Sequence, residues 1–397
     1  MRKLAATYLF TSQSQLIKNA ILVCENNGTI ADIVVKENGL REEAGLELYS
    51  GILVPGFVNA HCHLELSHLH NKIEENAGLA GFLGSINRLQ EIPGDEINKA
   101  MNVADRRMWA SGIAAVGDIS NSSQSLSIKK EGKISYHTFV EVFGFHPSRA
   151  GRAFKLAQEV HNEFSGAGLS SSIVPHAAYS VSETLFEMIN HRAKHDNSIL
   201  SIHNQESSVE ATFFKDGNGP IKGHYQKNLK LDTSHWQARK ESSLEFILKR
   251  LPTQNQLLLV HNTFTGEADL NLIKQERLSE NTFLVLCPNS NLFIENQLPP
   301  INLFQDSGYS ICLGTDSLAS NHQLSILEEM ITIQKYFPET KLEDLFNWAC
   351  FNGAQALKLD NTLGSFGLGK KPGVNLLTGI DLKQLKLTPH TKVKRLL

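Results

Sequence analysis

Eight short apolar runs, each bounded by turn residues, follow one another along the middle of this chain. Runs that are apolar without alternation are typical of parallel strands buried on both faces. The runs cover residues 56–60, 112–119, 136–143, 171–175, 199–203, 257–261, 282–287 and 309–314. Helical periodicity fills most of the intervals, over residues 97–110, 152–164, 183–194, 244–251 and 268–278. This alternation predicts right-handed βαβ units that close into an α/β fold, the (β/α)8 TIM barrel, whereas an open doubly wound sheet would need fewer strands.

The two ends of the chain have a different pattern. Short strand-like pieces at residues 20–24 and 30–35 alternate with Asn-Gly pairs at 27–28 and 38–39, which are hairpin-turn signals. Similar pieces return at residues 374–377 and 393–396. We therefore expect a small β-sandwich domain formed from both termini. The predicted division assigns residues 1–55 and 363–397 to that domain and residues 56–362 to the barrel.

Composition excludes several classes of protein. The 38 basic and 41 acidic residues give a net charge of −3, which does not provide the basic face of a nucleic-acid binder. Five scattered cysteines favour a reducing compartment over a disulfide framework. The sequence contains no apolar stretch of about 18 residues, so no membrane span is predicted. The run at residues 4–10 is expected to be a first strand rather than a signal peptide, and the expected location is the cytoplasm.

Side chains that bind metals stand at the carboxyl ends of several predicted strands. They are His61, His63, His203, His261 and Asp316. The first two are two residues apart, so both imidazoles face the same side of a strand. Barrel active sites are built at this end of the strands, where such groups are costly unless they are paired or coordinate an ion. We therefore predict a metal site there.

The donor types narrow the choice of metal. A nitrogen-rich set with one carboxylate suits one divalent ion, Zn²⁺ or Fe²⁺, rather than magnesium or calcium. A catalytic site of this kind keeps an open position for water. Glu206 follows His203 by three residues on the same rim, where a carboxylate can transfer protons.

Five motifs carry a resemblance to a known family. They are VPGFVNAHCH at 54–63, HNQE at 203–206, VHN at 260–262, CPNSN at 287–291 and GTDS at 314–317. In content and order they resemble the amidohydrolase superfamily, in the branch of cytosine, guanine and methylthioadenosine deaminases and chlorohydrolases. The stretch HCHLELS at 61–67 is also similar to aminodeoxyfutalosine deaminases. The segment KPGVNLL at 371–377 departs from the family's usual Gly-x-x-Ala-Asp-Leu-Val, outside the predicted site.

The resemblance implies a role for each site residue. One metal would be held by His61, His63, His203 and Asp316. Asp316 would also accept a proton from the attacking water, Glu206 would carry it to a substrate nitrogen, and His261 would orient the nucleophile or polarise the substrate. This branch lacks the carbamylated lysine of its two-metal relatives, and the fourth predicted strand here contains no lysine.

A substrate contact is implied in the same way. The segment PHAAYS at 175–180 resembles the Pro-His-Ala-Pro-Tyr segment of adenosine-type deaminases, where the histidine contacts substrate. His176 would take that role here. Ala178 replaces the second proline of the segment, so the loop is expected to be less fixed.

The implied reaction is hydrolytic deamination of a small molecule, an amino-substituted purine, pyrimidine, pterin or adenosine derivative such as aminodeoxyfutalosine. Two alternatives stay open: a chlorohydrolase or cyclic imine or amide hydrolase of the same fold, and a catalytically inert scaffold. The resemblance is compatible with a homodimer. The polar segment 207–241 is expected to be a long loop, acting as a lid or binding loop or forming a plain surface insertion. His224 and His235 in this segment are expected to be exposed to solvent, with a substrate contact from one of them as the alternative.

Overall fold

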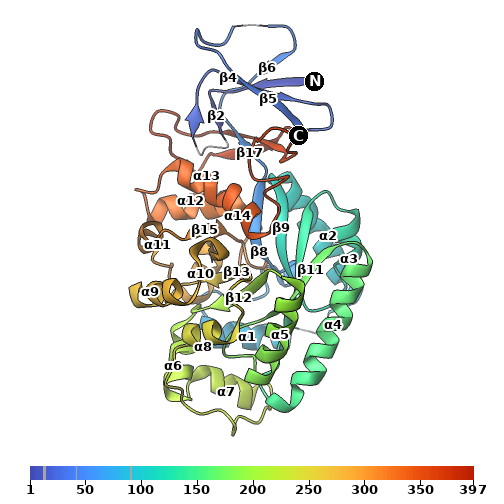
Figure 1. Ribbon diagram of the computed structural model, residues 1–397, viewed down its shortest axis with the longest axis vertical. Helices are drawn as coiled ribbons and strands as arrows, with labels where there is room; N and C mark the ends of the chain where they lie inside the picture. Colours follow the sequence, from blue (N-terminus) through green and yellow to red (C-terminus); the bar gives the residue numbers. More distant parts are fainter. Residues whose placement is uncertain (12–14, 42, 90–91) are drawn as a thin grey trace.

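A barrel of parallel strands forms the body of the molecule (Figure 1). The computed structural model describes residues 1–11, 15–41, 43–89 and 92–397. The barrel strands are β8 (Phe57–Cys62), β9 (Ile113–Ser120), β10 (Ser135–Val142), β11 (Ser170–Pro175), β12 (Leu200–Asn204), β13 (Leu257–His261), β14 (Thr282–Leu286) and β15 (Ser310–Leu313). They pair as two four-stranded sheets, β11-β10-β9-β8 and β12-β13-β14-β15. Parallel bridges between Cys62 and Asp316 and between Ala177 and His203 join the sheets at both seams, and the predicted TIM barrel is confirmed.

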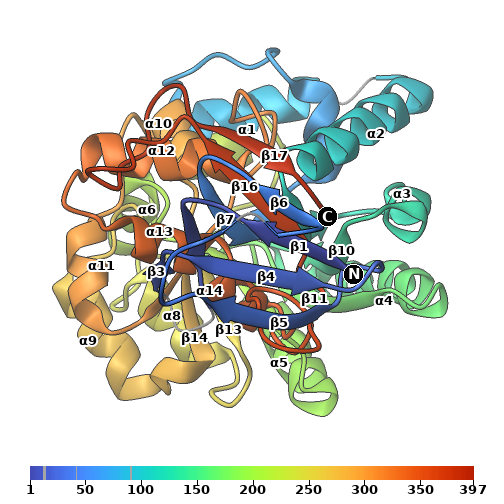
Figure 2. The same cartoon turned by 90° about the horizontal axis from the view of Figure 1, so that it is seen from above.

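Helices surround the barrel and cover its strands, as Figure 2 shows from above. This is why the strands are apolar throughout: one side faces the barrel interior and the other faces helices. The longer helices are α1 (Gly78–Arg88), α2 (Gly94–Ala110), α4 (Ala150–Gly166), α5 (Glu183–Asp196), α8 (Ser243–Arg250), α9 (Glu267–Glu276), α10 (Pro288–Glu295), α12 (Ile326–Tyr336) and α13 (Leu342–Ala349). Shorter ones are α3 (Leu126–Glu131), α11 (Ile301–Ser307) and α14 (Phe351–Ala356). Within the described ranges, no helix combines the length and apolarity that crossing a membrane requires.

Both ends of the chain build two sheets at the amino-terminal end of the barrel strands, where the N- and C-termini lie near each other (Figure 1). One sheet has the order β5-β4-β1-β6 and the other β17-β16-β7-β2-β3. Their strands are β1 (Arg2–Ala5), β2 (Tyr8–Phe10), β3 (Leu16–Ile17), β4 (Ala20–Cys24), β5 (Ile30–Val35), β6 (Leu46–Leu48), β7 (Ile52–Pro55), β16 (Val374–Thr378) and β17 (Lys392–Arg395). A shared apolar core that includes Leu4, Leu22, Leu53 and Leu376 packs between them. The predicted β-sandwich from both termini is present, and its limits at residues 55 and 363 stay a prediction.

Two sequence-based expectations are wrong in detail. The run at residues 4–10 is not one strand, because β1 and β2 belong to different sheets and the chain turns between them. The segment 207–241 is not a loop without a core, since it forms α6 (Ser208–Asp216) and α7 (Pro220–Lys227). Phe213 and Trp236 stack there with ring centroids 4.5 Å apart, and His224 is buried rather than exposed. Phe145, from elsewhere in the chain, packs against both of these rings.

A buried ion pair fixes the turn that follows β8. Lys129 Nζ lies 2.7 Å from Asp118 Oδ2, and both side chains are fully buried. Asp118 Oδ1 accepts a hydrogen bond of 2.8 Å from the backbone N–H of Leu64. Lys129 also donates to Ser120 Oγ and Thr138 Oγ1. The pair therefore holds the residue that follows His63 against β9.

Replacing Lys129 by methionine should destabilise the protein by about 3–5 kcal/mol, because it leaves the Asp118 carboxylate buried without a counter-charge. Denaturant unfolding followed by circular dichroism measures this loss. The exposed neighbour provides the matched control, since Lys130→Met should change the stability by less than about 0.5 kcal/mol. An equal effect of the two substitutions would contradict the importance of the buried pair.

Candidate metal and active site

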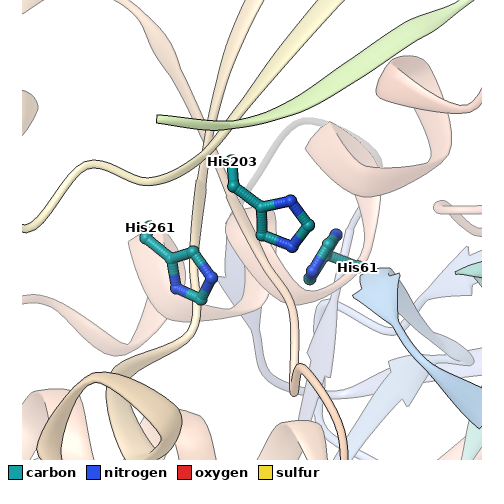
Figure 3. A group of neighbouring side chains, drawn as sticks. All are labelled: His61, His203 and His261. Carbon is teal, nitrogen blue, oxygen red and sulfur yellow. The ribbon is translucent and has the colours of Figure 1, made fainter. Parts of the chain in front are cut away.

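Four side chains converge at the carboxyl end of the barrel, two from each of its four-stranded sheets. His61 and His63 come from the end of β8, His203 from β12, and Asp316 follows β15. His63 Nε2 lies 3.1 Å from His61 Nε2, 3.3 Å from His203 Nε2 and 3.4 Å from Asp316 Oδ1. Figure 3 shows His61 and His203 gathered beside a fifth candidate, His261. The structure thus brings together residues that are far apart in sequence.

The spacing of these donor atoms fits a shared cation. In a tetrahedral site with ligand bonds of about 2.1 Å, neighbouring donor atoms lie about 3.4 Å apart. The four separations that join His63 to His61, His203 and Asp316, and His61 to Asp316, run from 3.1 to 3.8 Å. All four side chains are almost completely buried, where facing nitrogen lone pairs would repel one another without a positive ion between them. The donor set therefore fits one divalent metal.

Hydrogen bonds behind the cluster direct its donor atoms inward. His203 Nδ1 donates to the backbone carbonyl of His176 at 2.9 Å, which leaves Nε2 as the nitrogen with the lone pair. Asp316 Oδ2 accepts from Ser290 Oγ at 2.7 Å and Ser320 Oγ at 2.6 Å, which leaves Oδ1 facing the histidines. Asp316 also has a φ of 55°, a left-handed conformation that is uncommon for a residue other than glycine and is often found at functional sites.

The environment keeps the donors in the protonation states that a metal requires. Burial lowers the pKa of His63 to about 4 and that of His261 to about 3, so both imidazoles are neutral at pH 7. Burial also lowers the pKa of His61, and the neighbouring imidazoles add to that effect. Burial alone would raise the pKa of Asp316, but His63, His261 and the two serine hydroxyls lower it to about 2. Neutral imidazoles and an ionised carboxylate are the forms that coordinate metals.

His261 carries its proton on a different ring nitrogen from His203. Asn291 Nδ2 lies 3.3 Å from His261 Nδ1, so the amide donates to that nitrogen and Nε2 carries the proton. His261 Nε2 lies 3.8 Å from Glu206 Oε2. This arrangement makes His261 a hydrogen-bond donor toward the site. Its role in orienting a nucleophile or polarising a substrate stays a prediction.

Glu206 is a buried carboxyl group beside this cluster. Burial raises its pKa to about 8, although the Tyr179 hydroxyl donates to Oε1 at 2.6 Å and favours the ionised form. The group is therefore largely protonated at neutral pH and can act as an acid. Tyr225 of α7 donates to the backbone carbonyl of Tyr179 at 2.8 Å, which links the 207–241 segment to this carboxyl group.

His176, the predicted substrate contact, lies next to His203 at a ring-centroid distance of 4.7 Å. The structure also places two residues at the site that the sequence analysis did not assign, Tyr179 and Glu141. Tyr179 stands in the PHAAYS segment, three residues after His176. Glu141 is the only acidic residue of the predicted strand 136–143, and that isolated charge was an available signal.

Comparison with known proteins agrees with this geometry. The model of the amidohydrolase family matches residues 52–394. The chain belongs to the amidohydrolase family. Among curated amidohydrolase relatives, it is 28% identical over 352 residues to an adenosine deaminase of Helicobacter pylori, covering 85% of this chain and 84% of the relative. It is 26% identical to the 5-methylthioadenosine/S-adenosylhomocysteine deaminase of Clostridium tetani, covering 95% and 87%.

A solved structure shares the same architecture from end to end. It is the aminofutalosine deaminase of Helicobacter pylori in complex with methylthio-coformycin, with a TM-score of 0.81 and 23% identity over 100% of both chains. The barrel and the terminal sheets of this amidohydrolase therefore share the architecture of that structure.

Proposed function

We propose that this amidohydrolase is a metal-dependent deaminase of amino-substituted purine nucleosides. The observation that carries the proposal is the buried Glu206 carboxyl group, whose pKa burial raises to about 8, beside four metal-type donors. A donor set for a divalent ion and a nearby acid are the two components that hydrolytic deamination needs. The adenosine and methylthioadenosine deaminases among its relatives support a purine nucleoside as the substrate class.

The proposed metal is zinc, with ferrous iron as the other candidate for a set of three imidazoles and one carboxylate. Held by His61, His63, His203 and Asp316, a divalent ion would make water nucleophilic near neutral pH. The expectations of a homodimer and of a cytoplasmic location stay predictions.

The chain's own residues then move protons. Glu206 donates its proton to the ring nitrogen next to the carbon under attack, which makes that carbon more electrophilic. Asp316 Oδ1 accepts the proton that the attacking water releases, and the Nε2–H of His261 orients the oxygen. The carbon–nitrogen bond to the amino group then breaks. Asp316 gives the proton it took from water to the amino group, which leaves as ammonia, and the hydroxyl proton passes to the Glu206 carboxylate as the carbonyl group forms.

A substrate panel tests this function. The zinc-loaded protein is given adenosine, 5′-methylthioadenosine, aminodeoxyfutalosine, guanine, cytosine, a pterin and a chlorotriazine, and both ammonia and chloride are measured. We expect ammonia from the adenosine-type nucleosides with kcat/KM at least about 100-fold above that for the free bases. Chloride from the triazine without ammonia from any nucleoside would instead favour the chlorohydrolase alternative. An inert protein with full metal content would favour the scaffold.

The pH dependence of the reaction should report the proton on Glu206. Because the protonated form is the active acid, kcat/KM should fall as the pH rises through about 8. The Tyr179 hydroxyl favours the ionised form, so Tyr179→Phe should raise the pKa and move this alkaline limb about one pH unit higher. Tyr225→Phe is the control, because its hydroxyl bonds to a backbone carbonyl instead. A limb that stays in place in Tyr179→Phe would assign it to another group.

A further inference from the structure

Glu141 is a carboxylate at the end of β10 that neither the metal site nor the proton transfer uses. Its residue is 6% exposed. Asn121 Nδ2 donates to its Oε2 at 3.3 Å and to its backbone carbonyl at 3.2 Å. Within the described part of the chain, the other oxygen, Oε1, is buried without a hydrogen-bond partner. Such an atom is costly in the folded protein unless a ligand supplies its donor.

Orienting His203 does not account for that oxygen. Glu141 Oε1 lies 3.5 Å from His203 Nδ1, but the single proton on this nitrogen already bonds to the carbonyl of His176 at the shorter distance of 2.9 Å. A metal ligand thus has its supporting hydrogen bond without Glu141. Oε1 of Glu141 is therefore available to a group other than the His203 imidazole.

The neighbours of Glu141 form a wall suited to a polar ligand. A carboxylate oxygen of Glu141 and one nitrogen each of His176 and His203 lie within 4.8 Å of one another. His176 Nδ1 bonds to Ser180 Oγ at 2.7 Å, so its Nε2 is the nitrogen left for a ligand. The Phe143 ring packs on His176 at a centroid distance of 4.3 Å and is 48% exposed. Phe143 follows directly after β10, which ends at Val142.

Two residues that contact His176 also line a groove. A groove of about 580 Å³ begins at Phe143 and Ser180, the residues that flank His176. A substrate whose reacting ring lies at His61 and His203 would therefore place its next chemical group beside Glu141 and His176. In a nucleoside that group is the sugar, whose hydroxyls can donate to a carboxylate and bond to an imidazole nitrogen.

We infer that Glu141 is a specificity-determining residue that accepts a hydrogen bond from a sugar hydroxyl, so that the enzyme selects ribonucleosides with an intact diol. The inference rests on the proposed function and names a feature of its substrate. Its energetic basis is that a site with a buried acceptor rejects an analogue that lacks the matching hydroxyl.

The test compares two substrates in two variants. Glu141→Gln keeps an oxygen for Asn121 and presents an NH₂ group where the free carboxylate oxygen was. With adenosine, we expect its kcat/KM to fall about 10- to 100-fold, mainly through KM, because a hydrogen bond to bound substrate is lost. With 2′,3′-dideoxyadenosine, which has no sugar diol, the change should stay below about threefold. Metal content should equal that of the wild type.

Glu65→Gln provides the matched control. Glu65 is a partly buried carboxylate on the other side of Asn121, where its Oε2 accepts from the Asn121 backbone N–H at 3.0 Å. A purely structural disturbance of this network should lower activity toward both substrates in equal proportion. Equal losses in Glu141→Gln, or loss of its metal, would overturn the inference. Absence of ammonia from wild-type protein and adenosine would instead overturn the proposed function.

Discussion

Replacing Glu206 by glutamine should lower kcat by about 10³-fold while the metal content stays at the wild-type level. The amide has nearly the same shape as the carboxyl group and can still accept from Tyr179, so the pocket keeps its packing. It cannot deliver a proton to the ring nitrogen, which is the step assigned to this residue. Single-turnover ammonia release measures the loss, and metal analysis of the same sample tests whether the site is intact.

A second buried carboxyl group serves as the control. Burial also raises the pKa of Glu329 to about 8, but this group accepts from the Asn289 backbone N–H in α10 and from Asn321 Nδ2 after β15. Glu329→Gln should therefore cost less than about tenfold in kcat. If Glu206→Gln deaminates adenosine at close to the wild-type rate, the acid must be a different group.

Removal of the metal should abolish activity and lower the melting temperature together. The four donors face one another in a buried space, so an ion that binds the folded chain stabilises it by about 4 kcal/mol at a concentration 1,000 times its Kd. His61→Ala should lose the stoichiometric metal and all measurable deamination. Metal analysis, ammonia release and thermal unfolding with and without a chelator check the three effects.

The control variant His68→Ala distinguishes the loss of a metal ligand from general damage to the same segment. His68 lies close to the motif in sequence, but its Nδ1 bonds to the Glu65 carbonyl at 2.9 Å. This variant should keep its metal and most of its activity. Full metal occupancy in His61→Ala would show that the ion, if bound, lies elsewhere. Zinc added back to chelated wild-type protein should restore the rate.

The barrel was predictable because its strands are buried on both faces. That burial makes each strand continuously apolar, as in β13, and a polar residue at the end of such a run is conspicuous. His203 and His261 could be selected for this reason without knowledge of their neighbours. The order of the strands around the barrel followed from the handedness of βαβ connections.

The 207–241 segment was mispredicted because its apolar contacts join residues that are far apart in sequence. Its two helices are short, and Phe213 packs against Trp236 and Phe145, a contact that exists only after the chain has folded. The local composition is polar, so it predicted a loop. Tyr179 and Glu141 were not assigned for a related reason, since their importance depends on which atoms face them across the barrel.

The two four-stranded sheets of the barrel meet through isolated bridges, and each sheet provides two of the metal donors. An ion held by β8 of one sheet and by β12 and the loop after β15 of the other would cross-link the two sheets. Catalysis and mechanical closure of the barrel would then depend on one coordination shell. A chain without its ion would open first between β8 and β15. The lifetime of the folded enzyme would then depend on the concentration of free metal.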